Sequence, residues 1–354
     1  ALASCCGMIA SLDENMGRLD KMLEETGMKE NTILIFQSDN GGTAGVRFYN
    51  AGLRAGKITL WDGGHRTPFF LRWPAGGIQH GRDIGELTEV QDLLPTLIDL
   101  CGLKRPAGAE FDGVSLAGLL RGERERLEER MLVVQFSRMN VGRPQWGDAT
   151  VLWRKWRLVS GTELYDVSSD LAQTRNVIRE HPDVAARMRK HYDQWWREVE
   201  PRLDSFLPTH IGAEAENPVL VSPTEWADSF LDQSTQVRAG IRRNGLWHIQ
   251  VERAGEYEFA LRRWPRELDL AMRAPSPAHQ GECGQYAAGA ALPIARAELR
   301  IAGRAMELPV GPGDREAVFK TQLGEGRNTM QTFFHDEQGR EICGAYYVYA
   351  RRLS

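Results

Sequence analysis

The sequence has few cysteines, and their positions suit neither a zinc site nor a disulfide-rich framework. Five cysteines occur in 354 residues, and none lies in the paired Cys-x-x-Cys spacing that structural zinc sites use. The odd number excludes complete disulfide pairing, although one bridge between Cys283 and Cys343 stays open. Cysteine usage therefore does not indicate a redox compartment.

Long hydrophobic runs and an excess of one charge sign are also lacking. No apolar run approaches the roughly 20 residues of a transmembrane helix. Lysine and arginine number 44 against 48 acidic residues, and the net charge of -4 gives no long-range attraction to nucleic acid or anionic membranes. We therefore expect neither a membrane span nor a nucleic-acid partner.

The first residues lack the features of a secretion signal. Residues 1–7 have no basic start and no long apolar stretch, and the sequence does not begin with methionine. We interpret the chain as a fragment of a longer protein, whose address signal lies outside these residues. At 354 residues it is still too long for one ordinary hydrophobic core, which predicts two or three domains.

The first third has the pattern of an α/β domain, and we assign residues 1–130 to the second half of such a domain. Apolar residues three and four positions apart predict an amphipathic helix over 8–26. We interpret its methionines, like the tryptophans of the chain, as core residues. The apolar run 32–36 predicts a strand buried between helices in a parallel sheet. The other elements predicted here are a strand over 68–73 and a helix over 92–100, with Asp92 as its N-cap.

The rest of the chain changes character twice. Short β-type segments and a helix from Pro182 predict a small α+β subdomain over 131–200. The apolar stripe of this helix consists of Val184, Met188, Tyr192, Trp195 and Val199. Residues 201–223 are irregular and contain several prolines and glycines, which is typical of a linker. Beyond them, apolar and polar residues alternate in short segments without intervening helices, which predicts an all-β sandwich or barrel over 215–354.

Asp39 and Asn40 are the first candidate ligand-binding residues, because they follow the predicted strand at the end where α/β sheets bind ligands. A carboxylate next to an amide offers hard oxygen ligands, which suit Ca²⁺ or Mg²⁺ better than Zn²⁺. Asp-Asn-Gly-Gly at 39–42 is also the sequence of an ordinary turn, in which polar side chains bond to their own backbone. Two oxygens fall short of the roughly six to eight ligands of Ca²⁺.

Lys57 and His65 are the next candidates. A lysine ammonium is a compact cation that can neutralise a tetrahedral oxyanion, and the reference pKa of histidine lies near neutrality, which suits an acid or a base. Each has a structural alternative. A lone lysine is usually a solvated surface charge, and a histidine beside two glycines is usually bonded to backbone. Asp62 and Arg66 flank the same glycines and would brace that loop.

Residues 8–102 resemble the sulfatase family of the alkaline-phosphatase superfamily, because several stretches match that family in order and spacing. The matching stretches are 8–17, 31–42, Gly56-Lys57 through Arg66-Thr67-Pro68, Arg72-Trp73-Pro74 and 92–97. Farther along, Leu164-Tyr165-Asp166, Asn176 and the helix ending in Trp195-Trp196 are similar to the smaller carboxy-terminal subdomain of the family.

This resemblance implies roles for individual residues. Asp39 and Asn40 match a pair of calcium ligands, whose partners in the family are two aspartates near its amino terminus. Lys57 matches the lysine that contacts the substrate sulfate. The family nucleophile is formylglycine, formed from the cysteine of a Cys-x-Pro/Ala-x-Arg motif, while calcium and basic residues hold the sulfate oxygens. The resemblance also implies a periplasmic or secreted location.

The formylglycine motif is absent from this sequence. Cys101 to Arg105 has the outer spacing but leucine in the middle, and we interpret Cys101 as structural. The first aspartate pair and the arginine beside the nucleophile are absent as well. Asp62 stands where glutamate is common in the family, and His65 where an aliphatic residue is common.

We therefore predict the carboxy-terminal part of a sulfatase. In its full-length form it would hydrolyse a sulfate ester of a small molecule or a glycan, using formylglycine and Ca²⁺, with Mg²⁺ as the alternative metal. The fragment alone is expected to be inactive, with Lys57 as its catalytic and substrate-binding residue and His65 as a further substrate contact. Two alternatives stay open: a phosphodiesterase or phosphonate hydrolase of the same superfamily, and a non-catalytic carbohydrate-binding protein that uses the β-domain. The sequence does not indicate an oligomeric state.

Overall fold

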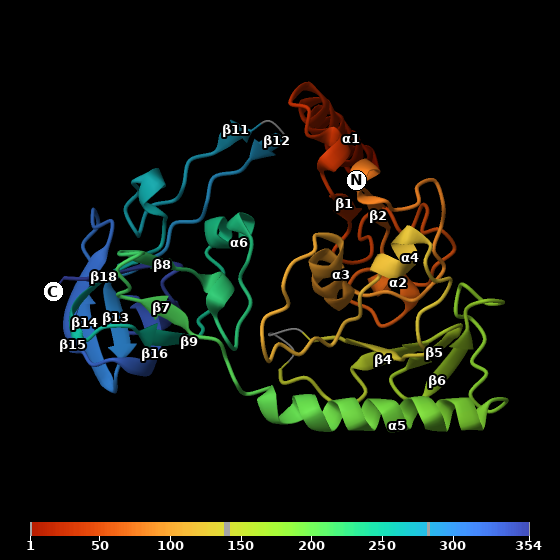
Figure 1. Ribbon diagram of the computed structural model, residues 1–354. Coiled ribbons are helices and arrows are strands. Elements are labelled where there is room, and N and C mark those ends of the chain that lie inside the picture. Colours follow the sequence, from red (N-terminus) through yellow and green to blue (C-terminus); the bar gives the residue numbers. More distant parts are fainter. Residues whose placement is uncertain (1, 138–141, 282–283, 354) are drawn as a thin grey trace. The chain divides into compact units, whose positions relative to one another are not determined.

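The computed structural model describes residues 2–137, 142–281 and 284–353. Among them, residues up to 137 together with 144–201 form unit 1, and residues 142–143 together with those from 202 onward form unit 2 (Figure 1). None of the helices formed by the described residues combines the length and the apolar character that crossing a bilayer requires.

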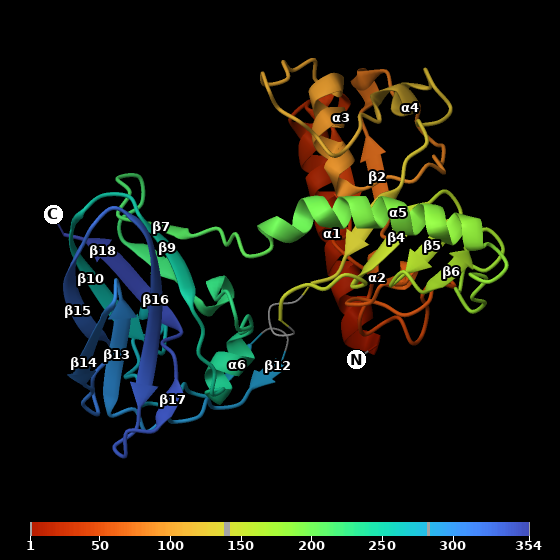
Figure 2. The same ribbon diagram turned by 90° about the horizontal axis from the view of Figure 1, so that it is seen from below.

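Unit 1 contains helices and short strands in mixed order. Its helices are α1 (Leu2–Glu25), α2 (Asp62–His65), α3 (Leu93–Leu100), α4 (Ala117–Arg121) and α5 (Pro182–Val199). Its strands are β1 (Leu34–Gln37), β2 (Phe69–Arg72), β3 (Leu132–Gln135), β4 (Ala149–Trp153), β5 (Trp156–Val159) and β6 (Glu163–Asp166). β1 pairs with β2, whereas β3 to β6 form a separate antiparallel sheet in chain order, along which α5 runs (Figure 2).

The predicted parallel arrangement is wrong for the first strand. β1 and β2 pair antiparallel, with Leu34 opposite Arg72 and Gln37 opposite Phe69. β1 is half-buried rather than covered on both faces, and Phe70 on β2 is 64% exposed. An apolar run identifies a strand but not the direction of its neighbour, because both kinds of pairing accept the same residue types.

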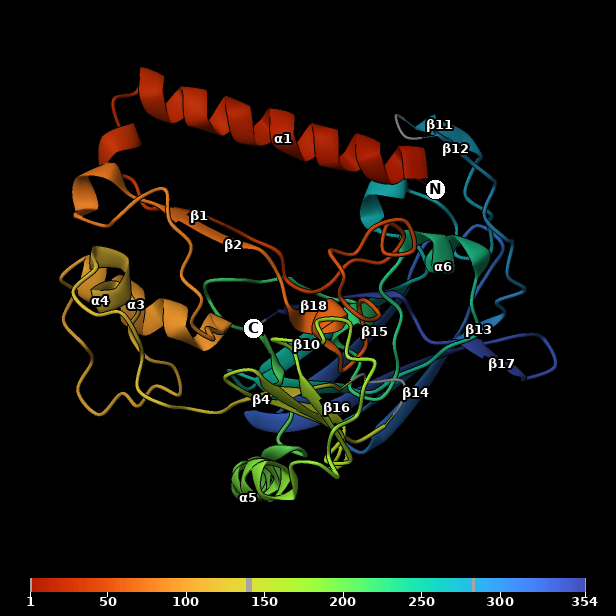
Figure 3. The same ribbon diagram turned by 90° about the vertical axis from the view of Figure 1, so that its right-hand side faces the viewer.

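α1 begins earlier than the predicted helix and leaves most of its apolar face uncovered. Of its residues only Leu23 is buried. The exposed apolar residues are Leu2, Met8, Ile9, Leu12 and Met22. Near its end, Asp20 pairs with Lys29 and with Arg72 of β2, at 2.8 Å each, so this end of α1 lies against the β1–β2 pair (Figure 3). The interpretation of the helix methionines as core residues is therefore wrong for the two that are exposed.

α3 follows a short 3₁₀ turn, Val90–Asp92, and the Asp92 side chain does not cap it as predicted. The carboxylate of Asp92 is fully buried and accepts hydrogen bonds from the backbone N–H groups of Glu89 and Val114, at 3.0 and 2.8 Å, and from Arg130. Burial alone would raise the pKa of Asp92, but these hydrogen bonds hold it below its usual value.

The second part of unit 1 is the β3–β6 sheet with α5. β4 is buried along its whole length, and α5 begins at Pro182, where proline fits the first helical turn. The buried residues of α5 are Ala185, Met188, Tyr192 and Trp196. Met188 and Tyr192 of the predicted stripe are thus buried, whereas its other members, Val184, Trp195 and Val199, are half-buried.

Unit 2 consists mainly of antiparallel strands around one apolar core. Its elements are β7 (Thr209–Ile211), β8 (Val219–Val221), α6 (Ser234–Ala239), β9 (Trp247–Val251), β10 (Gly255–Arg262), β11 (His279–Gly281), β12 (Gly284–Tyr286), β13 (Arg296–Ile301), β14 (Arg304–Pro309), β15 (Ala317–Leu323), β16 (Gly326–His335), β17 (Glu341–Cys343) and β18 (Tyr347–Arg352). One sheet has the order β15-β10-β18-β8. The other has the order β14-β13-β16-β9-β7, with β17 paired to β16. Buried residues of both sheets belong to one cluster.

The structure corrects the predicted linker over 201–223 and leaves the open cysteine bridge untested. β7 and β8 lie inside 201–223, which was predicted to be a linker, and β7 pairs with β9 in the one parallel pairing among the described strands. Cys343 is a buried free thiol. The other cysteine of the bridge that the sequence left open, Cys283, lies outside the described residues.

Candidate functional site

The loop after β1 carries the first two candidates, Asp39 and Asn40. The Asn40 amide nitrogen donates to Asp39 Oδ2 at 2.6 Å, and the Ser38 hydroxyl donates to the backbone carbonyl of Asn40 at 2.9 Å. Asp39 is exposed and Asn40 is half-buried. These hydrogen bonds are typical of a turn. The side-chain oxygen of Asn40 and the Oδ1 of Asp39 take no part in them, and both are hard oxygen ligands of the kind that Ca²⁺ binds. The loop therefore fits part of a cation site.

The rest of such a cation site is not supplied nearby. Within the described part of the chain, no group of three or more histidine, cysteine, aspartate or glutamate side chains could hold a metal ion. Asp39 and Asn40 would supply two oxygens, against about six to eight for Ca²⁺. Further ligands would have to come from outside this cluster.

Two backbone hydrogen bonds bring the loop with Lys57 against the loop with Asn40. The N–H of Lys57 donates to the carbonyl of Gly42 at 2.9 Å, and the N–H of Gly41 donates to the carbonyl of Gly64 at 2.9 Å. A Cβ at Gly41 would lie 1.8 Å from the carbonyl oxygen of Gly63. Only glycine permits so close an approach of two backbones. The two predicted elements of a sulfate site thus lie side by side.

Lys57 itself is exposed. Among the described residues, no carboxylate lies within ion-pair distance of its ammonium. An exposed, unpaired ammonium can bind an anion directly. A cation held by the oxygens of Asp39 and Asn40 would add a second positive charge on the neighbouring loop. This is what the arrangement can do chemically.

His65 is placed differently from Lys57. Its Nε2 lies 3.2 Å from the carbonyl oxygen of Leu60 and 3.9 Å from Asp62 Oδ1. Burial lowers the pKa of His65, while Asp62 and the Leu60 carbonyl oppose that shift. The ring nitrogen is thus engaged by its own loop, as in the structural alternative, and a substrate contact from His65 stays a prediction.

Sequence reasoning missed a buried ion pair that joins the loop of Lys57 and His65 to β5. Asp62 begins α2 and is fully buried, and Arg157 of β5 donates to its two carboxylate oxygens at 3.0 and 3.3 Å. The side-chain carbonyl of Gln173 accepts from the backbone N–H of Asp62 at 2.8 Å. Burial lowers the pKa of Arg157, and Asp62 opposes that shift. Arg66, predicted to brace the loop with Asp62, is only 4.0 Å from it and 55% exposed.

Arg54 makes a second contact between the loop and the β3–β6 part of unit 1. Its guanidinium lies 4.1 Å above the ring of Trp61 and donates to the Tyr165 hydroxyl at 3.1 Å and to the backbone carbonyl of Gln173 at 2.6 Å. The paired glycines at 41–42 and 63–64 are consistent with the close approach of the two loops, but no sequence signal indicates the partners of Arg54.

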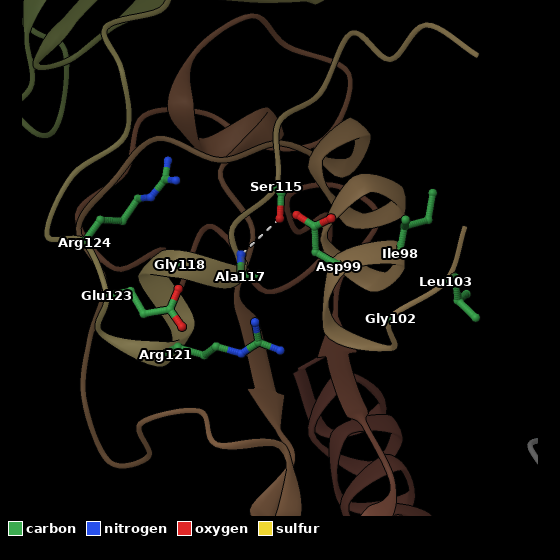
Figure 4. Close-up of a pocket in the computed structure, with 10 residues that line it drawn as sticks. All are labelled: Ile98, Asp99, Gly102, Leu103, Ser115, Ala117, Gly118, Arg121, Glu123 and Arg124. Carbon is green, nitrogen blue, oxygen red and sulfur yellow. Dashed lines mark hydrogen bonds between the residues drawn. The ribbon is translucent and has the colours of Figure 1, made fainter. Parts of the chain in front are cut away.

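A hollow of about 460 Å³ lies elsewhere in unit 1, between α3 and α4 (Figure 4). Its charged lining consists of Asp99, Arg121, Glu123 and Arg124. None of residues 39–65 lines it, so it is separate from the loops that carry Asp39, Asn40 and Lys57.

Comparison with known proteins identifies the class of protein. The family model "Sulfatase" matches residues 1–103, and the model "N-sulphoglucosamine sulphohydrolase, C-terminal" matches residues 56–198. The chain is 31% identical over 154 residues to a steryl-sulfatase of Mus musculus, covering 41% of this chain and 24% of that protein. It is 30% identical over 220 residues to a sulfatase of Formosa agariphila, covering 54% and 39%.

A solved structure, Ps i-CgsB in complex with k-i-k-neocarrahexaose, is similar with 24% identity and a TM-score of 0.46, covering 53% of this chain and 42% of that one. The chain belongs to the sulfatase family of alkaline-phosphatase-like proteins, of which it contains a partial sulfatase domain. The predicted family is thereby confirmed. The chain spans about a quarter to two fifths of the length of the two curated relatives.

Proposed function

We propose that unit 1 contributes the sulfate-binding and part of the calcium-binding surface of a sulfuric ester hydrolase. The observation that carries this proposal is the pair of backbone hydrogen bonds that joins the loop of Asp39 and Asn40 to the loop of Lys57. A sulfate group between these loops would meet the Lys57 ammonium on one side. A sulfate ester of a carbohydrate is the substrate class that we put forward, and the steryl-sulfatase relative is the reason to test a sterol ester beside it.

In this proposal Asp39 and Asn40 hold Ca²⁺ together with ligands from outside this cluster. Bound there, the cation would add positive charge beside the sulfate oxygens. The residues of this chain then have distinct tasks. Lys57 binds and orients a sulfate oxygen, and the glycine contacts keep the two loops in register.

The formylglycine nucleophile would be supplied by residues other than these 354, because the sequence contains no Cys-x-Pro/Ala-x-Arg motif. We therefore expect no turnover of 4-nitrophenyl sulfate by this chain alone, with or without Ca²⁺. Measurable release of nitrophenol at a rate proportional to the chain concentration would contradict this part of the proposal.

Acylation of individual lysines tests the anion-binding role. The chain would be treated with acetic anhydride in sulfate and in chloride at matched ionic strength, and acetylation would be quantified by mass spectrometry. Sulfate is expected to slow acetylation of Lys57 about threefold or more, because a bound anion covers the amine. Lys21, exposed on α1, serves as the control in the same sample.

The comparison of sulfate with phosphate in this assay distinguishes the proposed chemistry from phosphate-ester chemistry. Stronger protection of Lys57 by sulfate, increased further by Ca²⁺, supports a sulfatase. Equal acetylation rates of Lys57 in sulfate and chloride would contradict the proposed site.

A further inference from the structure

The loop that carries Lys57 has a strained backbone. Ala51, Ala55 and Ile58 all have left-handed φ angles, of 50°, 60° and 67°. For a β-branched residue such as Ile58 this conformation is an outlier, because its Cβ crowds the neighbouring carbonyl. Strain of this kind persists only where the surroundings determine the backbone, and it concentrates at functional sites. Ile58 is the residue directly after Lys57.

The contacts around Ile58 come first from the loop itself. The N–H of Lys57 donates to the Gly42 carbonyl at 2.9 Å, and the Thr59 hydroxyl donates to the Gly56 carbonyl at 2.7 Å. A Cβ at Gly64 would lie 2.2 Å from the backbone oxygen of Thr59. Both neighbours of Ile58 are therefore fixed by short contacts, while its own side chain is 55% exposed. Packing of the isoleucine side chain does not explain the conformation.

The second set of contacts reaches the loop from the β3–β6 part of unit 1. The Thr150 hydroxyl of β4 donates to the Leu60 carbonyl at 2.5 Å. Arg157 of β5 pairs with the buried Asp62, whose N–H is also bonded to Gln173. Arg157 is 4% exposed. A buried pair resists displacement, because separating it leaves an uncompensated charge in the interior.

We propose that Arg157 and Ile58 are positioning residues for Lys57. The buried Arg157–Asp62 pair keeps segment 54–65 closed against Gly41 and Gly42, and the left-handed turn at Ile58 fixes the direction in which the Lys57 side chain leaves the loop. The part of this proposal that concerns Lys57 rests on the proposed function, whereas the restraint on the backbone does not.

Hydrogen exchange tests the restraint without any ligand. The double variant Asp62→Asn/Arg157→Met removes both charges together, so that neither is left unpaired in the interior. Its cooperative thermal unfolding is measured first, as the check that the variant folds. Exchange of the amides of Gly41, Lys57 and Gly63 is expected to become about tenfold faster, because the loop opens more often. Lys155→Met is the matched control: it removes a cation two residues from Arg157, from an exposed pair with Asp166.

Two variants of Ile58 test the turn. Ile58→Gly removes the steric strain, whereas Ile58→Ala shortens the side chain but keeps a Cβ in the left-handed region. We expect Ile58→Gly to unfold at a temperature about 2 °C higher than Ile58→Ala. Sulfate protection of Lys57 against acetylation should nevertheless fall about threefold in Ile58→Gly and stay nearly unchanged in Ile58→Ala. A purely structural role of Ile58 would change the unfolding temperature but leave sulfate protection of Lys57 equal in the two variants.

The outcomes separate the two proposals. Unchanged exchange of the three amides in Asp62→Asn/Arg157→Met would overturn the role of Arg157. Equal sulfate protection in the two Ile58 variants would overturn the role of Ile58. No sulfate protection of Lys57 in the unsubstituted chain would overturn the proposed function, and the exchange measurement would still decide whether Arg157 restrains the loop.

Discussion

Arg130 donates to both carboxylate oxygens of Asp92, at 2.7 and 2.6 Å, across 38 residues of sequence. The same guanidinium donates to the Leu87 carbonyl at 2.8 Å. Arg130 thus joins the turn before α3 to the start of β3. Glu89 belongs to this cluster, and burial followed by repulsion from Asp92 raises its pKa to about 7, although Arg130 opposes that shift.

The raised pKa of Glu89 predicts a pH dependence of stability. The folded state binds this proton more tightly than the unfolded state, so the free energy of unfolding should fall as pH rises from the ordinary value of 4.5 through about 7. The shift would correspond to about 3 kcal/mol for a fully buried group. Solvent screening at this partly exposed side chain reduces the expected effect to about 1–2 kcal/mol.

Glu89→Gln measures this effect, because the amide keeps an acceptor for the turn but does not ionise. In urea unfolding of unit 1, the variant should match the unsubstituted chain below pH 4.5 and exceed it above about pH 7. Glu110→Gln, at an exposed position, is the control. A constant difference between Glu89→Gln and the unsubstituted chain at every pH would show that ionisation of Glu89 is not the cause.

Gly41→Ala should separate the two candidate loops. The added methyl group would lie 1.8 Å from the Gly63 carbonyl oxygen, so one backbone has to move. We expect a loss of about 2–3 kcal/mol in the stability of unit 1, as for other overpacked sites, together with loss of sulfate protection at Lys57. Gly85→Ala is the matched control, since nothing lies near a Cβ there. Retention of both stability and sulfate protection in Gly41→Ala would contradict the close approach.

The exposed face of α1 predicts binding of apolar dyes. Met8 is 67% exposed and Leu12 is 49% exposed on one stripe of the helix, and contiguous apolar surface of this kind binds hydrophobic probes. Met8→Glu/Leu12→Glu should lower the fluorescence of 1-anilinonaphthalene-8-sulfonate bound to the chain, with a stability change within about 0.5 kcal/mol. Leu23→Ala should instead cost about 2–3 kcal/mol, because Leu23 is buried. Equal stability losses in the two variants would mean that the stripe is covered.

The positions of many strands and helices could be predicted from the sequence, because periodicity reports local burial. The alternation in β9 and β10 matches their buried residues, such as Trp247, Ile249 and Tyr257. Strand direction could not be predicted, since the apolar run of β1 carries no information about its neighbour. β7 and β8 were missed because each has only three residues between prolines and glycines.

The candidate site was only partly predictable. Asp39, Asn40 and Lys57 could be named from their spacing and from a family resemblance, and the structure brings their loops together. Arg157 could not be named, because an arginine in a short strand has the pattern of a surface residue and its partner Asp62 lies 95 residues away. Contacts of this kind depend on the tertiary fold rather than on local sequence.

The most direct test of the central claim is a crystal structure of this chain grown with Ca²⁺ and sulfate, with the cation located by its anomalous scattering. We predict Ca²⁺ about 2.3–2.6 Å from an oxygen of Asp39 and of Asn40, and a sulfate in hydrogen-bond contact with Lys57 Nζ. Ca²⁺ and sulfate bound at other places, with Lys57 directed into solvent away from Asp39 and Asn40, would contradict the account.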